Sequence, residues 1–297
     1  MASARYDLSV STDGGSAPAV LRVLEKFGYS AACLERNVAG RLTKGDACGL
    51  ALPLRSTSEM RIGQLSRVTL AMELAGDAAE LSLTSVAARS YDVVAVRPMS
   101  ERVFALACEQ MECDLISIDA ATVLPFALRQ GLVEAAVKRG MYFEIVYSPA
   151  LRDATARRHL ISNALELVRA TRGRNIVLSS GAADPMDIRG PHDVANLAML
   201  FGLNEAAARS AVSAWPRAVL DRARERRRGA REGGVQCVAV AELPAKDAWM
   251  AAAGGEGGGG GEGGKGGGGE DEDGDGDEGG GGAHAAFGGG GSDFIGF

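Results

Sequence analysis

The segment Gly140–Leu203 reads GMYFEIVYSPALRDATARRHLISNALELVRATRGRNIVLSSGAADPMDIRGPHDVANLAMLFGL, and it decides the fold class of this chain. Tyr142–Tyr147 is an apolar, aromatic and β-branched run, as in a strand buried on both faces. Asn175–Leu178 is a second such run. Between the two, apolar side chains recur at intervals of three and four residues, as on one helix face: Ile161, Leu165 and Val168. The segment therefore predicts a strand, a helix and a parallel strand.

The same alternation extends toward the N-terminus. Further strands are expected at Tyr6–Val10, Ser30–Leu34, Arg67–Leu74, Tyr91–Val96 and Asp114–Ile118. Helices are expected at Pro18–Phe27, at Leu81–Arg89, from an N-cap at Ser100 to Glu109, and at Gly131–Arg139. Residues 36–64 contain interspersed Gly, Pro, Ser and Thr, so a surface loop is expected there.

Helices are expected after the last strand. They span Asp193–Phe201 and Asn204–Val212, and a final helix begins near Pro216 after an interruption at Trp215-Pro216. Seven strands that alternate with helices predict an α/β barrel or a doubly wound sheet. The barrel is favoured because no glycine-rich phosphate-binding turn opens the first helix, although an eighth strand is not evident.

The composition separates the chain into two parts. After Ala253 lie 24 of the 41 glycines and ten acidic residues against the single Lys265. Residues 1–253 keep 31 basic and 28 acidic residues, a formal charge of about +3, whereas the whole chain carries −6. We therefore expect a barrel domain at residues 1–235 and a disordered, glycine-rich acidic tail at residues 236–297.

The five cysteines are scattered in an odd number without a C-x-x-C pair, so we expect free thiols in a reducing compartment: Cys33, Cys48, Cys108, Cys113 and Cys237. The N-terminus has no apolar signal-peptide core, and no run is long enough to span a bilayer. These features favour a soluble intracellular protein.

The sequence offers little for hydrolytic chemistry. It has three histidines, with no H-x-H or H-E-x-x-H pattern, no G-x-S-x-G turn and no phosphate-binding glycine loop between a strand and a helix. Four carboxylates lie in or near expected strands and leave a magnesium site open as an alternative: Asp7, Glu35, Asp119 and Glu144. The simpler interpretation is that they accept hydrogen bonds from loop amides.

Arginines are the more informative residues. They follow the expected sixth strand, flank the seventh, and crowd residues 217–231, which contain seven arginines and two acids. Any one cluster is typical of a solvated surface, but together they favour a surface that binds a polyanion such as RNA. The candidate RNA-binding residues are Arg152, Arg157, Arg158, Arg172, Arg174, Arg189, Arg217, Arg222, Arg226 and Arg227.

Two motifs some 40 residues apart carry a family resemblance: FEIVYSPA at residues 143–150 and RGPHDVANL at residues 189–197. With YDVVAV at 91–96, CDLI at 113–116 and NIVLSS at 175–180, they resemble the thirty-kilodalton protein subunit of ribonuclease P and ribonuclease MRP. The resemblance covers about residues 5–230. It implies a TIM-barrel-like fold with about seven recognisable parallel strands, related to PHP-type phosphoesterases.

The resemblance implies an accessory protein without catalytic residues, metal or cofactor. In this family the RNA subunit removes the 5′ leader of precursor tRNA, and the barrel protein binds and shapes that RNA with a Pop-five-type protein partner. Placement in the nucleus and nucleolus is implied in the same way, and the sequence does not distinguish ribonuclease P from MRP. A diverged PHP-type metal-dependent phosphoesterase is the alternative function.

Structural roles are expected for the matched motif residues. Pro149 and Pro191 would fix loops at strand ends, Gly190 would permit a tight turn, Asp193 would lie at the positive end of a helix, and Asn196 would tie the loop back through its amide. Arg189 is expected to contact either an RNA phosphate or a carboxylate of the fold.

Overall fold

The computed structural model describes residues 4–12, 15–50, 52, 54, 60–79 and 86–231. In these ranges, seven parallel strands form one sheet in chain order. They are β1 (Tyr6–Ser11), β2 (Ala31–Ala39), β3 (Gly63–Met72), β4 (Val93–Pro98), β5 (Leu115–Ile118), β6 (Phe143–Val146) and β7 (Ile176–Ser179). The expected tail at 236–297 lies outside the described residues, so the domain boundary and the tail's disorder stay predictions.

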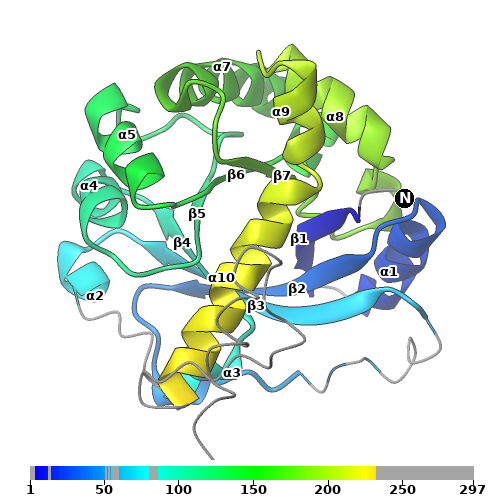
Figure 1. The fold of residues 1–297 in the computed structure, drawn as a ribbon, viewed down its shortest axis with the longest axis horizontal. Coiled ribbons are helices and arrows are strands. Elements are labelled where there is room, and N and C mark those ends of the chain that lie inside the picture. The colour runs from blue at the N-terminus through cyan, green and yellow to red at the C-terminus, as the bar shows by residue number, and fades with distance from the viewer. Residues whose placement is uncertain are drawn as a thin grey trace, which may run out of the picture. The chain divides into compact units, whose positions relative to one another are not determined.

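The sheet curls into a nearly closed barrel because the chain beyond β7 lies beside β1 (Figure 1). Val10 and Ala182 form a parallel bridge. The Gly181 N–H donates to the Ser9 carbonyl at 2.8 Å, and the Ser11 N–H donates to the Ala182 carbonyl at 3.0 Å. The expected barrel is confirmed, and the doubly wound alternative is wrong, because its strand order would reverse at a switch point.

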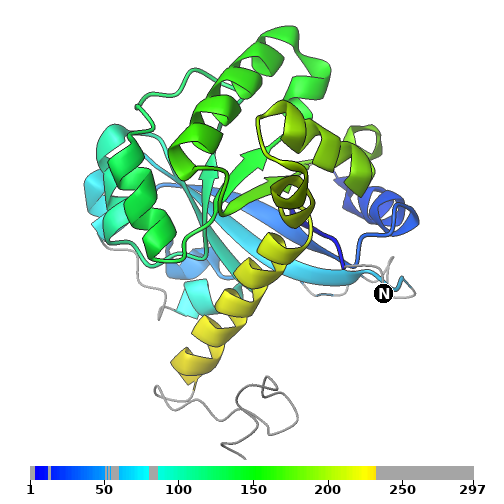
Figure 2. The same ribbon diagram turned by 45° about the horizontal axis from the view of Figure 1, so that its top comes forward.

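Helices surround this barrel (Figures 1 and 2). They are α1 (Ala17–Lys26), α2 (Ala75–Ala79), α3 (Val86–Ser90), α4 (Glu101–Glu109), α5 (Gln130–Lys138), α6 (Ser148–Arg152), α7 (Ala154–Thr171), α8 (Pro191–Leu200), α9 (Glu205–Ser210) and α10 (Ala214–Arg231), with 3-10 turns η2 (Lys44–Asp46) and η4 (Pro185–Asp187). The largest core cluster joins strand residues such as Val94, Ile116 and Phe143 to helix residues such as Phe104 and Leu160. This layer holds the helices on the outer face of the sheet.

Helix α10 lies across the strands rather than alongside them (Figures 1 and 2). Its Val219, Leu220 and Ala223 pack against side chains from several strands: Leu8, Cys33, Leu65, Val93, Ala95, Leu115 and Val177. Arg226 of α10 also reaches Asp114, which directly precedes β5. Helix α10 therefore covers the N-terminal end of the barrel.

The expectation of a loop over residues 36–64 is wrong at both ends. Strand β2 continues to Ala39, and β3 begins at Gly63, four residues before the expected start. The two strands pair without interruption from Ala31 opposite Gly63 to Ala39 opposite Ala71. The polar run that follows Leu34 hid the rest of β2, because side chains that point into this barrel are polar.

Other boundaries shift for identifiable reasons. Helix α7 buries Leu160, Ala164 and Leu167, so its buried face is rotated by one residue from the expected stripe, of which only Val168 is buried. Helix α10 includes Pro216 in its first turn, where a missing N–H has no helical partner to lose, so the expected interruption is wrong. Part of the helix expected at Leu81–Arg89 lies outside the described residues.

The described cysteines are free thiols, as expected: Cys33, Cys48, Cys108 and Cys113. Burial raises the pKa of Cys108 and of Cys113 to about 12, which keeps both protonated. In the described part of the chain, no helix combines the length and apolar character that crossing a bilayer requires.

Candidate RNA-binding surfaces and the polar barrel interior

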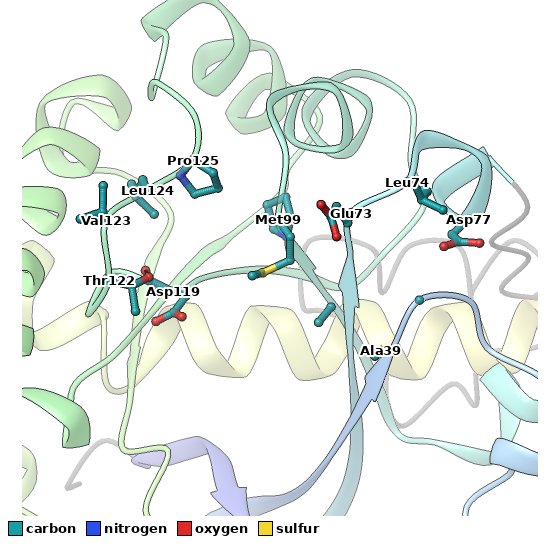
Figure 3. A pocket seen from close by; sticks show the side chains of 13 residues that line it. Ala39, Glu73, Leu74, Asp77, Met99, Asp119, Thr122, Val123, Leu124 and Pro125 are labelled. Atoms are coloured by element: carbon teal, nitrogen blue, oxygen red, sulfur yellow. Dashed lines mark hydrogen bonds between the residues drawn. The ribbon is translucent and has the colours of Figure 1, made fainter.

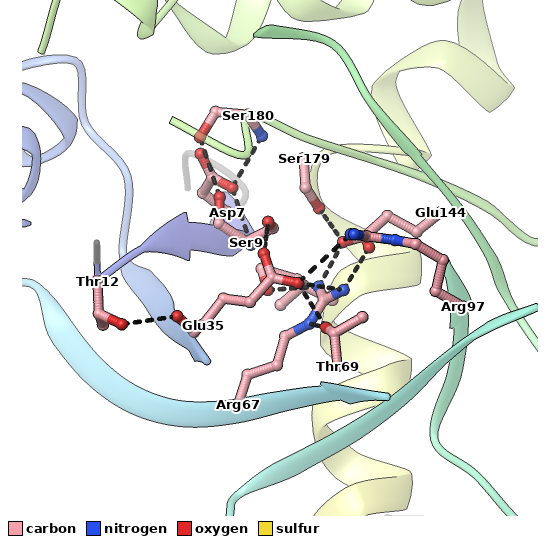
Figure 4. A network of polar contacts seen from close by, with 11 residues as sticks. Asp7, Ser9, Thr12, Glu35, Arg67, Thr69, Arg97, Glu144, Ser179 and Ser180 are labelled. Carbon is pink, nitrogen blue, oxygen red and sulfur yellow. Dashed lines mark hydrogen bonds and ion pairs between the residues drawn. The ribbon is translucent and has the colours of Figure 1, made fainter. Parts of the chain in front are cut away.

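The centre of the barrel holds a fully buried ion pair (Figure 4). The Arg67 guanidinium, on β3, donates from Nη1 and Nη2 to the two carboxylate oxygens of Glu144 on β6, each at 2.5 Å. Arg67 Nη1 also donates to the Leu8 carbonyl at 2.6 Å, and Nε donates to the Thr69 hydroxyl at 3.0 Å. All five donor hydrogens of an arginine need partners when it is buried, and this arrangement supplies partners at each nitrogen.

Glu35, on β2, extends the network. Its carboxylate lies 3.5 Å from Arg67 Nη2 and 3.7 Å from Arg97 Nη2, and it accepts hydrogen bonds from the Ser9 and Thr69 hydroxyls. Two carboxylates and two guanidiniums therefore neutralise each other inside the barrel.

The pKa of each partner in the central pair follows from this geometry. Burial disfavours the charged form of Glu144, but the adjacent Arg67 outweighs it, and the pKa of Glu144 lies below its ordinary value. Burial acts in the same way against Arg67, yet its two carboxylate neighbours raise its pKa. Both groups stay ionised, and the pair holds β3 to β6 across the barrel.

Asp7, on β1, is buried and forms no ion pair with another described residue. It accepts the Ser180 N–H at 3.0 Å and the Ser9 N–H at 3.2 Å. Burial raises the pKa of Asp7 to about 6 against these hydrogen bonds. The expectation of loop amides around strand carboxylates is therefore met at Asp7.

The four carboxylates that could have formed a magnesium site do not converge. Arg67 lies against both Glu35 and Glu144, while Asp119 lies beyond the end of β5 in a surface pocket. Among the described residues, no group of three or more His, Cys, Asp or Glu side chains is placed to hold a metal ion. The geometry gives no support to a carboxylate-only metal site.

Arg152 and Tyr147, which follow β6, contact the segment after β7, and Tyr29, between α1 and β2, contacts the same segment. Arg152 donates from Nε and Nη2 to the two carboxylate oxygens of Asp187 at 2.7 and 2.8 Å. The Arg189 N–H donates to the Tyr147 hydroxyl at 3.2 Å, and the Tyr29 hydroxyl donates to the Arg189 carbonyl at 3.2 Å. Burial raises the pKa of both tyrosines, which keeps them protonated.

The Arg189 guanidinium contacts its own loop. Its Nη1 donates to the carbonyls of Met186 and Ile188, each at 2.8 Å. The expected carboxylate contact is not formed with any described residue, and Arg152 makes the carboxylate pair instead. Contact between Arg189 and an RNA phosphate stays a prediction.

The RGPHDVANL motif positions the start of α8. Pro191 is the first residue of α8 and Asp193 lies in its first turn, as expected. Gly190 has an ordinary φ of −60°, so the expected tight turn that needs glycine is not formed there; a Cβ at this position would lie 3.1 Å from a carboxylate oxygen of the exposed Asp193. Asn196 is exposed and its amide makes no hydrogen bond with the described residues. Pro149 is the second residue of α6.

Several arginines expected to bind RNA make contacts within the fold. Arg226 donates to Asp114 at 2.9–3.1 Å, Arg227 pairs with Asp92, and Arg222 donates to the carbonyls of residues 139 and 140. At the other end of the barrel, Arg157 donates to the Ala150 carbonyl at 2.8 Å. Arg222, Arg226 and Arg227 thus attach α10 to the N-terminal end of the barrel, and Arg157 connects α7 to α6.

The remaining candidates lie on the surface. Arg158 and Arg174 are exposed and have no ion pair with another described residue, whereas Arg172 lies 4.0 Å from Glu134 and Arg217 lies 3.5 Å from Asp221. Arg158 lies near the start of α7, which follows β6 and α6, and Arg174 precedes β7, so they lie at opposite ends of the barrel. The structure does not bring all ten arginines to one surface.

The model of the family described as RNase P subunit p30 matches residues 4–228, which includes every strand and almost all of α10. The chain belongs to the RNase P subunit p30 family. This agrees with the resemblance that the motifs at 143–150 and 189–197 carry.

Two relatives show how far the p30 family likeness extends. Mouse "Ribonuclease P protein subunit p30" is 45% identical over 168 residues, which are 57% of this chain and 63% of the mouse protein. "Probable ribonuclease P protein subunit 3" of Schizosaccharomyces pombe is 36% identical over 207 residues, 70% of this chain and 86% of the relative. The chain thus spans less than two thirds of the mouse relative's length.

A solved structure shares the p30 fold. One chain in the "cryo-EM structure of archaeal Ribonuclease P with mature tRNA" aligns with a TM-score of 0.58 at 10% identity, over 78% of this chain and 98% of that one. At this identity the likeness concerns the fold alone.

Sequence reasoning missed the partners that give this p30-family chain its internal ion pairs. Arg67 was part of an expected strand, and Asp92, Asp114 and Asp187 had no expected role. An available signal was the alternation Leu65, Arg67, Thr69, which places a charged side chain on the inward face of a buried strand.

Proposed function

We propose that this chain is a non-catalytic protein subunit of ribonuclease P. It binds and shapes the catalytic RNA and so supports removal of the 5′ leader from precursor tRNA. The observation that carries the proposal is the family match across the whole barrel, residues 4–228. The occupied barrel interior supports it, because Arg67 lies between the carboxylates that a hydrolytic metal centre would need.

The proposal extends to partners and location. The relatives are named as ribonuclease P subunits, and one from Saccharomyces cerevisiae is named as a ribonuclease P/MRP subunit. We therefore assign this chain the ribonuclease P or MRP RNA and other protein subunits of the particle, especially a Pop-five-type subunit, as partners. We place it in the nucleus and nucleolus. Sequencing the RNA that co-purifies with the chain distinguishes the two particles.

A reconstitution experiment tests the function. Cleavage of precursor tRNA by the RNA subunit and its other proteins should depend on this chain, while the chain alone with Mn²⁺ should not hydrolyse a phosphoester. Metal-dependent turnover by the chain alone that is lost in Asp7→Asn or Glu144→Gln, and retained in Glu112→Gln, would establish the phosphoesterase alternative instead.

A further inference from the structure

A groove lined by apolar and acidic side chains opens at the C-terminal end of the barrel (Figure 3). Its volume is about 680 Å³, and it is lined by the residues that follow β2, β3, β4 and β5: Gly40, Glu73, Met99 and Asp119. This is the end of a TIM-like barrel at which ligands are usually bound. None of the arginines considered above lines the groove.

The walls of the groove expose apolar side chains. Leu74 is 66% exposed, Val123 is 73% exposed and Met99 is 41% exposed. Figure 3 shows Met99 between the segment that carries Leu74 and the segment 122–125. Large apolar side chains that gather around a concave surface mark an interaction site, because covering them removes apolar area from water.

The charged residues of the groove have one sign. Three of its lining residues are acidic and none is basic: Glu73, Asp77 and Asp119. In the described part of the chain these carboxylates have no ion pair, unlike Glu101 nearby, which pairs with Arg129 at 2.6 Å. Unpaired carboxylates repel a polyanion and attract a cation, so the groove does not suit RNA.

We propose that this groove docks a basic, apolar segment of a protein partner. Leucine-like side chains of that segment would cover Leu74, Met99 and Val123, while its flanking lysines or arginines would pair with Glu73, Asp77 and Asp119. The inference goes beyond the RNA-binding role and does not depend on it, because none of the candidate RNA-binding arginines lines the groove and the expected ligand has the opposite charge.

Three synthetic peptides with the same leucines test the proposal. The flanking positions are lysine and arginine in the basic peptide, glutamine in the neutral peptide and glutamate in the acidic peptide. Fluorescence anisotropy with the full chain should show binding of the basic peptide that weakens with salt, and at least about tenfold weaker binding of the other two. Equal affinity for all three would overturn the proposal. So would undiminished binding of a basic peptide in which serine replaces the leucines.

Variants of the full chain locate the binding. Glu73→Gln with Asp77→Asn should weaken the basic peptide about tenfold. The control, Glu109→Gln with Glu112→Gln, removes two exposed charges at the far end of α4 and should leave binding unchanged. Leu74→Ser with Val123→Ser should also weaken it, against Val86→Ser as the control. Thermal melts confirm folding, since all of these side chains are at least partly exposed.

The RNA affinity of the same variants distinguishes a protein-binding groove from a nucleic-acid surface. Affinity for a single-stranded RNA oligonucleotide should stay unchanged or rise slightly in Glu73→Gln with Asp77→Asn, because the double variant removes negative charge. A loss of RNA affinity in that variant, in proportion to the loss of peptide affinity, would show a nucleic-acid surface and overturn the proposal. If the unmodified chain does not bind RNA at all, the proposed function is refuted, whereas the proposal for the groove still stands on the peptide measurements.

Discussion

Arg67 shows how one residue organises the interior of this barrel. It is 0% exposed and bonds to β1, β3 and β6, so its guanidinium links strands that are far apart in the chain. A buried ion pair need not add net stability over an apolar pair, but removing one partner leaves a buried charge uncompensated. The network therefore makes the barrel sensitive to single substitutions at its centre.

Glu144→Gln should strongly destabilise the protein. The amide cannot neutralise Arg67, and we expect a loss of about 3 kcal/mol in the free energy of unfolding, measured by urea denaturation. Glu101→Gln breaks the exposed pair with Arg129 and should change stability by less than about 1 kcal/mol. Similar losses in the two variants would contradict a structural role for the buried pair.

Asp7 should make stability depend on pH between 4 and 6. Its folded pKa of about 6 exceeds the ordinary 3.8, so the folded state binds the proton more tightly. The contribution of Asp7 to the free energy of unfolding is complete below pH 3.8 and is lost as the pH rises through about 6. Its total size is about 3 kcal/mol.

Asp7→Asn should remove this component of the pH dependence. The asparagine stays neutral and its oxygen can still accept the Ser180 and Ser9 N–H groups, so stability at pH 7.5 should equal or exceed that of the unmodified chain. Urea denaturation from pH 4.5 to 8 measures both effects. Glu112→Gln serves as the exposed control. An unaltered pH profile in Asp7→Asn would show that Asp7 titrates normally.

Among the helices, α10 does not continue the alternation of strands and helices; it packs across the N-terminal end of the barrel. Its Val219, Leu220 and Ala223 cover the N-terminal end of the barrel, and Arg226 connects it to the start of β5. Burial raises the pKa of Asp114, and the charge of Arg226 opposes this shift. Removing Arg226 would therefore leave a buried carboxylate without its counter-charge. An arginine-rich helix therefore serves the fold on one side and leaves other arginines exposed.

Arg226→Ala should loosen α10. The side chain is 11% exposed and Asp114 is 1% exposed, so we expect a loss of about 2 kcal/mol in the free energy of unfolding. Arg224→Ala, on the same helix with a 63% exposed side chain, should stay within about 0.5 kcal/mol. Hydrogen exchange should show earlier opening of α10 in the first variant; equal exchange in both would refute the attachment.

At the scale of the molecule, charged side chains are distributed unevenly over the described surface. Exposed arginines lie at both ends of the barrel along α7, whereas the groove around Met99 has only acidic charges. In the particle proposed above the chain would contact both RNA and protein, and a groove lined by acids without arginines would favour the protein contact.

Arg158→Ala and Arg174→Ala should each weaken RNA binding through the phosphate backbone. Each lost contact should lower the slope of log affinity against log salt by about 0.7 to 0.9. The control is Arg22→Ala on α1, which removes the same charge outside the candidate set. Filter binding over a salt series measures the slopes. Identical slopes for all three variants would show that neither arginine contacts a phosphate.

Much of the fold could be predicted because its signals are local. The composition of Tyr142–Tyr147 and of Asn175–Leu178 predicts a buried strand in each. Asn204 predicts the cap of α9, where its side chain accepts a hydrogen bond from the Ala207 N–H. The family resemblance depends on short motifs for the same reason. Strand β2 beyond Leu34 was missed because its inward residues are polar, which removes the apolar signal.

Local patterns in the sequence were enough to predict an α/β barrel of seven strands and the family resemblance, and they showed where the arginines lie along the chain. The roles of the charged residues depend on tertiary contacts between distant positions: Arg67 and Glu144 are 77 residues apart, Arg226 and Asp114 are 112 apart, and Asp7 and Ser180 are 173 apart. Whether an arginine is buried against a carboxylate or left to bind an anion depends on which strand ends the fold brings together. No local pattern contains that information.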